Sequence, residues 1–285
     1  MGHPPKEGVS VISSSEKALR PAVRALLGSG DVAAQGAGHA EVSGVNAAKQ
    51  MGLTPTGVAA SRPICSACAQ FLRSLGINAL SSLKVEVKTM VGEEKKLLAC
   101  FSQTKRLAFA LLIFERMLPR LIAFSNDTGF DNSCYLNARD AAWVALQCNG
   151  IDHIDQSLTQ ACLNNAPDTE AFSHNLTSYA LNAALAIGDI LEFIVDGRTD
   201  HITYISTLAT DSIYLYLSGL SSAVVSSSHE GEEIAQHVLM QQEVQRQEDD
   251  IRFLSELPDQ FDNKSLAAVR ARARSQASLL PDAPS

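Results

Sequence analysis

Residues 83–92 read LKVEVKTMVG, and the pattern of the chain changes within this stretch. Its first half, LKVEV, alternates apolar and polar side chains, which is typical of a half-buried β-strand. After Gly92 such strand patterns stop, and only helical spacing follows. The sequence therefore predicts two domains and a flexible tail, at residues 1–91, 92–278 and 279–285.

Upstream of this stretch, strand-like and helix-like segments alternate along the chain. Short β-branched runs favour strands, and glycines or a proline stand where the helices would begin or end. Strands that alternate with helices are typical of an α/β layer. The expected strands are Val9–Ile12, Thr56–Ala60 and Leu83–Val87, and the expected helices are Glu16–Leu27, His39–Met51 and Pro63–Leu75.

Downstream of Gly92 the sequence predicts an all-α helical bundle, so the whole chain is expected to be a two-domain α+β protein. Apolar residues recur at helical spacing, and the breaks contain Asn, Gly or Pro. Short connections of this kind are expected between neighbouring helices of a bundle. The expected helices cover residues 94–124, 134–148, 155–164, 171–195, 201–218, 230–256 and 263–276.

Composition limits the class of protein. With 285 residues, 46% of them hydrophobic and 19% charged, the chain is long enough for buried cores and is globular rather than disordered. Its longest apolar run, Leu107–Phe114, is far shorter than the roughly 20 residues of a membrane-spanning helix, and the first residues do not resemble a secretory signal. We therefore expect a cytoplasmic protein that does not bind a membrane.

The six cysteines do not suggest a disulfide framework, because disulfide-dense proteins are usually small and secreted. Only Cys65 and Cys68 are close in sequence. The other four lie in apolar helical patterns, where a free cysteine behaves as a small buried hydrophobic residue. These four are Cys100, Cys134, Cys148 and Cys162.

Charge is distributed unevenly. Residues 1–90 carry nine Lys or Arg and five Asp or Glu, a net charge of +4, whereas the remaining residues carry 14 and 26, a net charge of −12. Opposite charges on adjacent domains favour docking of one on the other. The alternative is that two solvated surfaces merely differ in charge.

One histidine, one glutamate and two cysteines form the most informative pattern, HAE at 39–41 followed by PICSAC at 63–68. A catalytic zinc ion takes three protein ligands, and one imidazole with two thiolates satisfies that number. Cys65 and Cys68 are three residues apart at an expected helix start, so they project to the same side, where the helix dipole favours thiolates. Glu41 is then a carboxylate beside the metal. This is the pattern of zinc deaminases, in which zinc activates water and a non-ligand Glu transfers protons.

Two other interpretations of the cysteines compete with a catalytic centre. A C-x-x-C pair also occurs in redox proteins, but no thioredoxin-like context surrounds this one. It can also be half of a structural zinc site, which needs a fourth ligand, and no nearby Cys or His supplies it.

The run GHAEVSGVNAAKQMGLTPTGVAASRPICSACAQFLRSLG, residues 38–76, contains both halves of this pattern. It resembles the deaminase domains found at the C-termini of bacterial polymorphic toxins, and the resemblance extends more loosely over residues 9–88. It implies a cytidine-deaminase-like α/β domain, with or without the first strand of its sheet. It also implies that His39, Cys65 and Cys68 bind zinc, that Glu41 transfers protons, and that the substrate is a nucleobase, a nucleoside or single-stranded nucleic acid.

Five segments characterise the helical part: ERMLPRLIAFSNDTGFDN, APDTEAF, ALNAALAIGDILE, STLATDSIYLY and EVQRQEDDIRFL, beginning at residues 115, 166, 180, 206 and 243. Residues 93–275 resemble the YjaG-like family of uncharacterised all-helical bacterial proteins on these segments. The resemblance implies a helical fold but no catalytic residues. Four acidic residues within apolar helices could form a metal-binding carboxylate cluster, or could pair with Arg116 or Arg120 or cap helices. They are Glu115, Asp189, Glu192 and Asp211.

The sequence supports two hypotheses on function. In the first, the N-terminal domain is a toxin-type, zinc-dependent deaminase that hydrolyses an amidine-type C–N bond, and the acidic helical domain is its immunity or regulatory partner. In the second, the N-terminal domain is an inert deaminase remnant attached to a helical binding protein.

Overall fold

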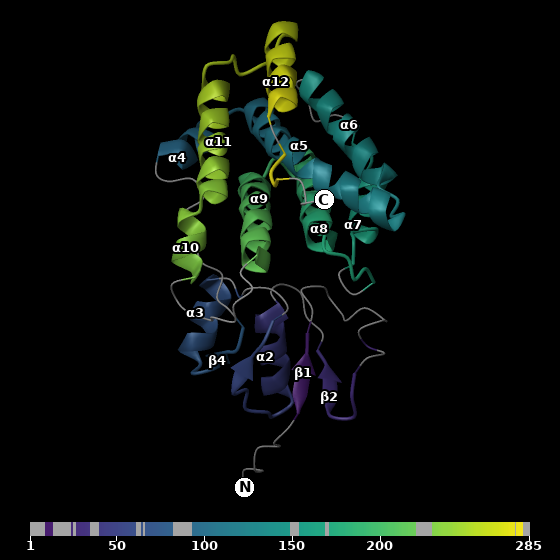
Figure 1. Ribbon diagram of the computed structural model, residues 1–285, viewed down its shortest axis with the longest axis vertical. Helices are drawn as coiled ribbons and strands as arrows, with labels where there is room; N and C mark the ends of the chain where they lie inside the picture. The colour runs from purple at the N-terminus through teal and green to yellow at the C-terminus, as the bar shows by residue number, and fades with distance from the viewer. Residues whose placement is uncertain are drawn as a thin grey trace. The chain divides into compact units, whose positions relative to one another are not determined.

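The computed structural model describes residues 9–13, 24, 27–34, 40–60, 64, 66–81, 93–148, 154–168, 171–220, 230–276 and 278–281 (Figure 1). The chain divides into two compact units. Unit 1 consists of Met1–Glu86 with Ser226–Gly231, and unit 2 consists of Val87–Val225 with Glu232–Ser285. Each unit is described by itself.

The described part of unit 1 contains two helices and four very short strands. Strands β1 and β2 pair in parallel, with Val11 opposite Val32, and strands β3 and β4 pair in parallel, with Gly57 opposite Asn78. The elements are β1 (Ser10–Ile12), β2 (Asp31–Ala33), α2 (Ala40–Gln50), β3 (Gly57–Val58), α3 (Ser66–Ser74) and β4 (Asn78–Ala79).

The prediction of a cytidine-deaminase-like α/β domain is wrong. In the described residues the strands form two separate two-stranded sheets, of three and two residues in length, and the chain is mostly helical. Strands this short form few ladder hydrogen bonds and offer no broad face on which helices can pack. The predicted strand at Leu83–Val87 lies outside the described residues, as does the predicted helix at Glu16–Leu27 apart from Arg24 and Leu27.

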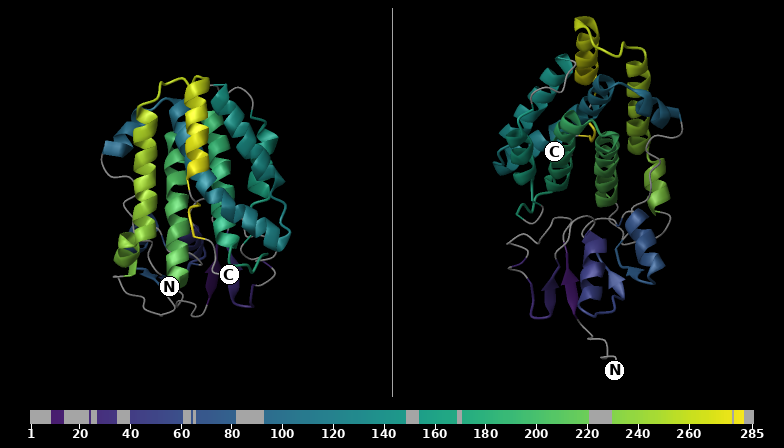
Figure 2. Two further views of the ribbon diagram at one scale, coloured as in Figure 1. Left: turned by 45° about the horizontal axis from the view of Figure 1, so that its top comes forward. Right: turned by 180° about the vertical axis from the view of Figure 1, so that it is seen from behind.

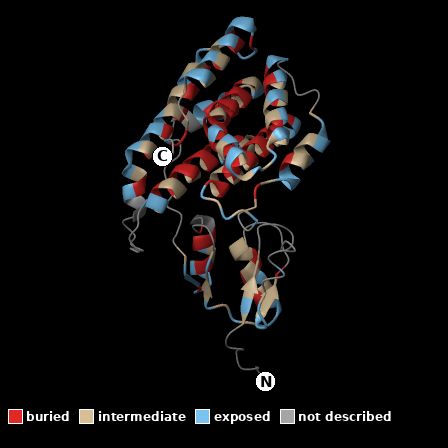
Figure 3. Cartoon of the chain, turned by 45° about the vertical axis from the view of Figure 1, so that its right-hand side comes forward, coloured by how far each residue is buried: buried red, intermediate tan, exposed pale blue. Residues whose placement is uncertain are grey.

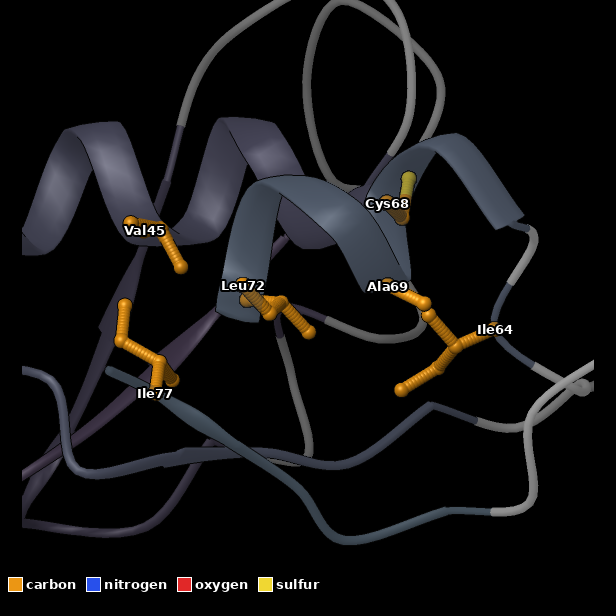
Figure 4. Close-up of a cluster of buried hydrophobic side chains, with 6 residues drawn as sticks. All are labelled: Val45, Ile64, Cys68, Ala69, Leu72 and Ile77. Atoms are coloured by element: carbon orange, nitrogen blue, oxygen red, sulfur yellow. The ribbon is translucent and has the colours of Figure 1, made fainter. Parts of the chain in front are cut away.

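Helices α2 and α3 of unit 1 share a small hydrophobic core, shown in Figure 4. Val45 of α2 packs in one cluster with Cys68 and Leu72 of α3. Ala69, Ile64 and Ile77 complete the buried cluster, and Phe71 packs against it. The core therefore packs the two helices together, and their first turns contain Glu41 and Cys68 of the predicted zinc pattern.

In the described residues of unit 2, all regular secondary structure is helical. Helices α5, α8 and α9 pack on one another at its centre, and α6, α7, α11 and α12 pack around them (Figure 2). Burial is greatest along the central helices (Figure 3). The helices are α4 (Glu93–Cys100), α5 (Gln103–Thr128), α6 (Ser133–Gln147), α7 (Gln156–Asn164), α8 (Thr177–Asp196), α9 (Thr199–Leu220), α10 (Glu230–Gln236), α11 (Val238–Ser255) and α12 (Asn263–Ser275).

Side-chain caps explain why two expected helices are each split in two. The expected helix 94–124 breaks before α5, where the Ser102 hydroxyl accepts a hydrogen bond from the backbone N–H of Lys105. The expected helix 230–256 breaks before α11, where the His237 imidazole accepts one from the backbone N–H of Leu239. Each cap satisfies an N–H group that would otherwise lack a partner at a helix start.

Two further expectations need correction. Leu279 and Leu280, which the sequence places in a flexible tail, are buried, and the backbone N–H of Leu279 donates to the carbonyl of Arg116 at 2.9 Å. Among the cysteines expected in the core, Cys162 is buried, Cys134 is half-buried, and Cys100 and Cys148 are exposed. A helical pattern does not reveal that a cysteine lies on the solvent side of its helix.

By length and mean hydropathy alone, α8 could cross a membrane. However, 61% of the most apolar stretch of this helix is buried inside the structure. A helix that is apolar around much of its circumference is also typical of the centre of a bundle. The predictions of a cytoplasmic location and of no membrane binding stay predictions.

Candidate functional site

The first turns of α2 and α3 bring together two of the predicted site residues, Glu41 and Cys68. The thiol of Cys68 donates to the carboxylate of Glu41, with 3.5 Å between Sγ and Oε2. Cys68 is buried and Glu41 is half-buried. The two residues are 27 positions apart in the sequence, so their contact is a result of folding and not of local spacing.

Contacts with β1 fix the start of α2. The Ser13 hydroxyl, just after β1, donates to the carbonyl of Ala40 at 2.6 Å. Gly44 on α2 permits this close approach, because a Cβ atom there would lie 2.7 Å from Ser13 Oγ. The position of Glu41 therefore depends on Ser13 and Gly44 as well as on the hydrophobic core.

The other two predicted site residues, His39 and Cys65, lie outside the described residues. Each directly precedes a described residue, Ala40 in one case and Ser66 in the other. The structure thus brings Glu41 and Cys68 together, and the predicted zinc site as a whole stays a prediction.

A second polar cluster centres on His201, in the first turn of α9. Its Nδ1 lies 2.7 Å from Asp189 Oδ1 and 3.6 Å from Glu192 Oε2, and its Nε2 lies 3.1 Å from Asp196 Oδ2. The three acidic residues belong to α8, at positions i, i+3 and i+7, which share one helix face. Gly197, with φ of 70°, ends α8 and turns the chain so that α9 presents His201 to that face.

Burial sets the protonation behaviour of this cluster. It raises the pKa of Asp189 to about 6, against the opposing effect of the hydrogen bond to His201. Burial also disfavours the imidazolium form of His201, but the hydrogen bonds to Asp189 and Asp196 outweigh it, so the pKa of His201 is raised. Both shifts favour binding of a proton at the contact between His201 and Asp189.

A third group of charges lies in unit 2, and three of its members, Arg116, Glu243 and Asp250, are fully buried. Arg116 of α5 contacts Glu243 at 2.8 Å and Asp250 at 2.7 Å, both on α11. The other oxygen of Asp250 accepts from Arg272 Nε at 2.6 Å and Gln276 Nε2 at 2.7 Å. Because these charges are balanced and hydrogen-bonded to each other, the network is structural.

The partners that the sequence suggested for the acidic helix residues differ from those observed. Glu115 accepts hydrogen bonds from Arg139 Nε and Trp143 Nε1, both at 2.7 Å, and not from Arg116. Asp189 and Glu192 meet His201, which the sequence did not single out. A combined signal was present in the sequence: three acids on one helix face, then a glycine, then a histidine four residues later.

Comparisons with known proteins concern mainly the helical part. The sequence model of a family described as "Protein of unknown function (DUF416)" matches residues 94–278. The crystal structure of a DUF416 family protein from Shewanella baltica OS155 is similar with a TM-score of 0.59 and 21% identity, over 67% of this chain and 97% of that protein. At this identity the similarity shows the fold alone. No curated protein matches the chain.

Proposed function

Because the chain belongs to the DUF416 family, for which no function is described, we propose a function from residues outside the matched segment. Glu41 and Cys68 belong to a zinc-dependent deaminase centre that is completed by His39 and Cys65. Its substrate is a cytosine- or adenine-type base, free, in a nucleoside or in single-stranded nucleic acid. The proposal concerns this local centre and does not depend on a deaminase-like sheet.

The contact between Glu41 and Cys68 carries the proposal. A zinc deaminase needs a carboxylate that is not a ligand but lies beside the ligands. The 3.5 Å separation of Cys68 Sγ and Glu41 Oε2 supports this arrangement. His39 is two residues before Glu41, and Cys65 is three residues before Cys68, so the other two predicted ligands are close in sequence to the pair of residues in contact.

The chemistry of these residues fits zinc. A cysteine thiolate and an imidazole are ligands that zinc prefers, and a helix start such as that of α3 favours the thiolate. Bound zinc would supply Lewis-acid activation of water. Cys68 is buried and thus positioned firmly, whereas Glu41 is half-buried. In the proposed reaction, Glu41 takes a proton from water and delivers it to the leaving amino group.

In this proposal the acidic helical unit restrains the basic N-terminal unit as an immunity or regulatory partner. The support is the charge difference, +4 for residues 1–90 and −12 for the remainder. Electrostatic docking weakens as salt screens the charges. We therefore expect deaminase activity of the full chain to rise with salt before it falls. A monotonic fall in activity from low salt onward would contradict this regulatory role.

The test is the zinc content of the purified full chain under reducing, metal-replete conditions. We expect about one zinc ion per chain, lost in the Cys65→Ser/Cys68→Ser double variant. The matched control is Cys100→Ser/Cys148→Ser, which removes two exposed cysteines of unit 2 and should keep the zinc. Glu41→Gln should also keep the zinc but stop ammonia release from nucleobase substrates.

A second candidate function is favoured by the short strands of unit 1, because two-stranded sheets of this length are only marginally stable. In this alternative the N-terminal unit is an inert remnant, and the helical unit is a binding protein. The absence of zinc from the full chain, or zinc that persists in the Cys65→Ser/Cys68→Ser variant, would reject the deaminase centre and favour the alternative.

A further inference from the structure

We propose that Asp189, Glu192 and His201 bind a divalent transition-metal ion at the junction of α8 and α9. This site lies in the helical unit, and it is independent of the deaminase centre proposed for the N-terminal unit. It stands on the distances between the ligand atoms, on the orientation of the imidazole, and on the charge of the cluster.

The ligand atoms have the spacing that one metal ion requires. His201 Nδ1 lies 2.7 Å from Asp189 Oδ1 and 3.6 Å from Glu192 Oε2, and all three atoms lie within 4.8 Å of one another. Nitrogen and oxygen ligands sit about 2.0–2.2 Å from a transition-metal ion, so neighbouring ligands are about 3 Å apart. A metal ion bound to these three atoms would therefore replace the contact between Nδ1 and Asp189, with small side-chain movements.

Asp196 orients the imidazole as a metal ligand. Its Oδ2 lies 3.1 Å from His201 Nε2, and the backbone N–H of Arg198 donates to its Oδ1 at 2.8 Å, which fixes the carboxylate. In the metal-bound form, Nε2–H would donate to Asp196, and the lone pair of Nδ1 would be directed at the ion between Asp189 and Glu192. Histidine ligands in metal sites almost always donate their second ring N–H in this way.

The cluster also has an excess of negative charge. Three carboxylates surround one imidazole, and the Asp189 side chain is only 17% exposed. The neighbouring cation, Arg198, contacts Asp200 at 3.2 Å, and among the described residues no lysine or arginine forms an ion pair with Asp189 or Glu192. Among the described residues, His201 supplies one positive charge against three carboxylates, and a divalent cation would neutralise the excess of negative charge.

The ligand set indicates the class of metal. One imidazole and two carboxylates suit Mn²⁺ or Fe²⁺, whereas thiolate sites select softer ions such as Zn²⁺. The Glu192 side chain is 44% exposed, so water can occupy the remaining coordination positions. Mn²⁺ is the probe of choice, since the proposed Cys-containing centre in the N-terminal unit disfavours it.

The experiment is a titration of the full chain with Mn²⁺, in which electron paramagnetic resonance measures the free ion. We expect one saturable site, at least tenfold weaker in Asp189→Asn and in His201→Gln. Asp196→Asn should weaken binding about 10- to 100-fold, as loss of a carboxylate that orients a ligand does. Asp200→Asn is the matched control, because this nearby side chain is 85% exposed and lies outside the site. Glu41→Gln should also leave Mn²⁺ binding unchanged.

A measurement on the unaltered chain covers the case in which a variant does not fold. Bound Mn²⁺ broadens the nuclear magnetic resonance signals of nearby amides, and we expect the strongest broadening between residues 189 and 201. Broadening centred elsewhere, the lack of a saturable site, or unchanged affinity in folded Asp189→Asn and His201→Gln would each overturn the proposal.

Discussion

Arg116 of α5 and Asp250 of α11 form an ion pair that is completely removed from solvent, with 2.7 Å between Nη1 and Oδ2. The same guanidinium contacts Glu243, which is equally buried, at 2.8 Å. Arg116 also donates to Gln276, and its carbonyl accepts from Leu279. One arginine therefore joins α5 to α11 and to the segment that follows α12.

We predict that Arg116→Met destabilises the helical unit strongly. The substitution leaves the carboxylates of Glu243 and Asp250 buried without their main positive partner, and breaking a buried pair from one side costs about 3–5 kcal/mol. Urea unfolding of the full chain, followed by circular dichroism, measures the loss in the free energy of unfolding.

The control is Arg252→Met. Arg252 forms ion pairs with Glu248 and Asp249 on the same helix, α11, but its side chain is 55% exposed. Exposed pairs contribute about 0–1 kcal/mol because water and salt screen them. If both variants lowered the free energy of unfolding equally, the buried network would not have the structural role assigned to it.

A second prediction concerns the segment after α12. Leu279 is buried and hydrogen-bonded to α5, and Arg120 donates to the carbonyl of Pro281. Leu279→Ala should therefore lower the free energy of unfolding by about 2–5 kcal/mol, as in other buried positions. Leu220→Ala, at a residue that is 61% exposed, should change it by less than about 0.5 kcal/mol. Similar losses in the free energy of unfolding for Leu279→Ala and Leu220→Ala would indicate that residues 279–281 form a loose tail.

The helices of unit 2 could be predicted from the sequence because their apolar periodicity is strong. The run Leu107–Phe114, for example, is buried throughout and lies within α5. The splits at Ser102 and His237 were not predicted, because a cap depends on a local backbone conformation that periodicity does not encode.

Partners between elements could not be predicted. Glu243 and Asp250 lie 127 and 134 residues from Arg116, and no spacing rule shows which helix faces meet. The lack of a rule for distant partners also accounts for the wrong prediction of an α/β domain, because short alternating segments do not specify which strands pair. It also explains why Asp189 and Glu192 were singled out while His201, on the next helix, was not.

The candidate zinc pattern is a different case. Glu41 and Cys68 were predicted to lie together from the chemistry that the residue types would share, and the two side chains are in contact. Their contact is observed, whereas the zinc site that motivated the prediction stays a prediction.

The cysteines provide a third prediction, on chemical reactivity. Burial raises the pKa of Cys162 to about 12, and it also raises the pKa of Cys134. Only the thiolate reacts with iodoacetamide, so at about pH 8 to 10 Cys162 should stay unmodified in the folded chain. The exposed Cys100 and Cys148 should react before Cys162. Peptide mass spectrometry after timed labelling measures the order, and early modification of Cys162 would contradict its burial.

The last prediction concerns Gly129, the residue that ends α5. Its φ is 73°, and its backbone N–H donates to the carbonyl of Ser125 at 2.9 Å. A Cβ atom there would meet nothing within 4 Å, so any cost of Gly129→Ala is conformational and not steric. We expect a loss of about 1 kcal/mol in the free energy of unfolding, because left-handed backbone disfavours alanine.

Two further variants separate this conformational cost from general effects of replacing glycine. Gly129→Asn should lose less than Gly129→Ala, since asparagine tolerates the left-handed conformation better. Gly219→Ala, in α9, also meets nothing within 4 Å but has no positive φ. It should therefore be neutral or slightly stabilising. Equal losses in urea unfolding for Gly129→Ala and Gly129→Asn would show that the left-handed turn does not determine where α5 ends.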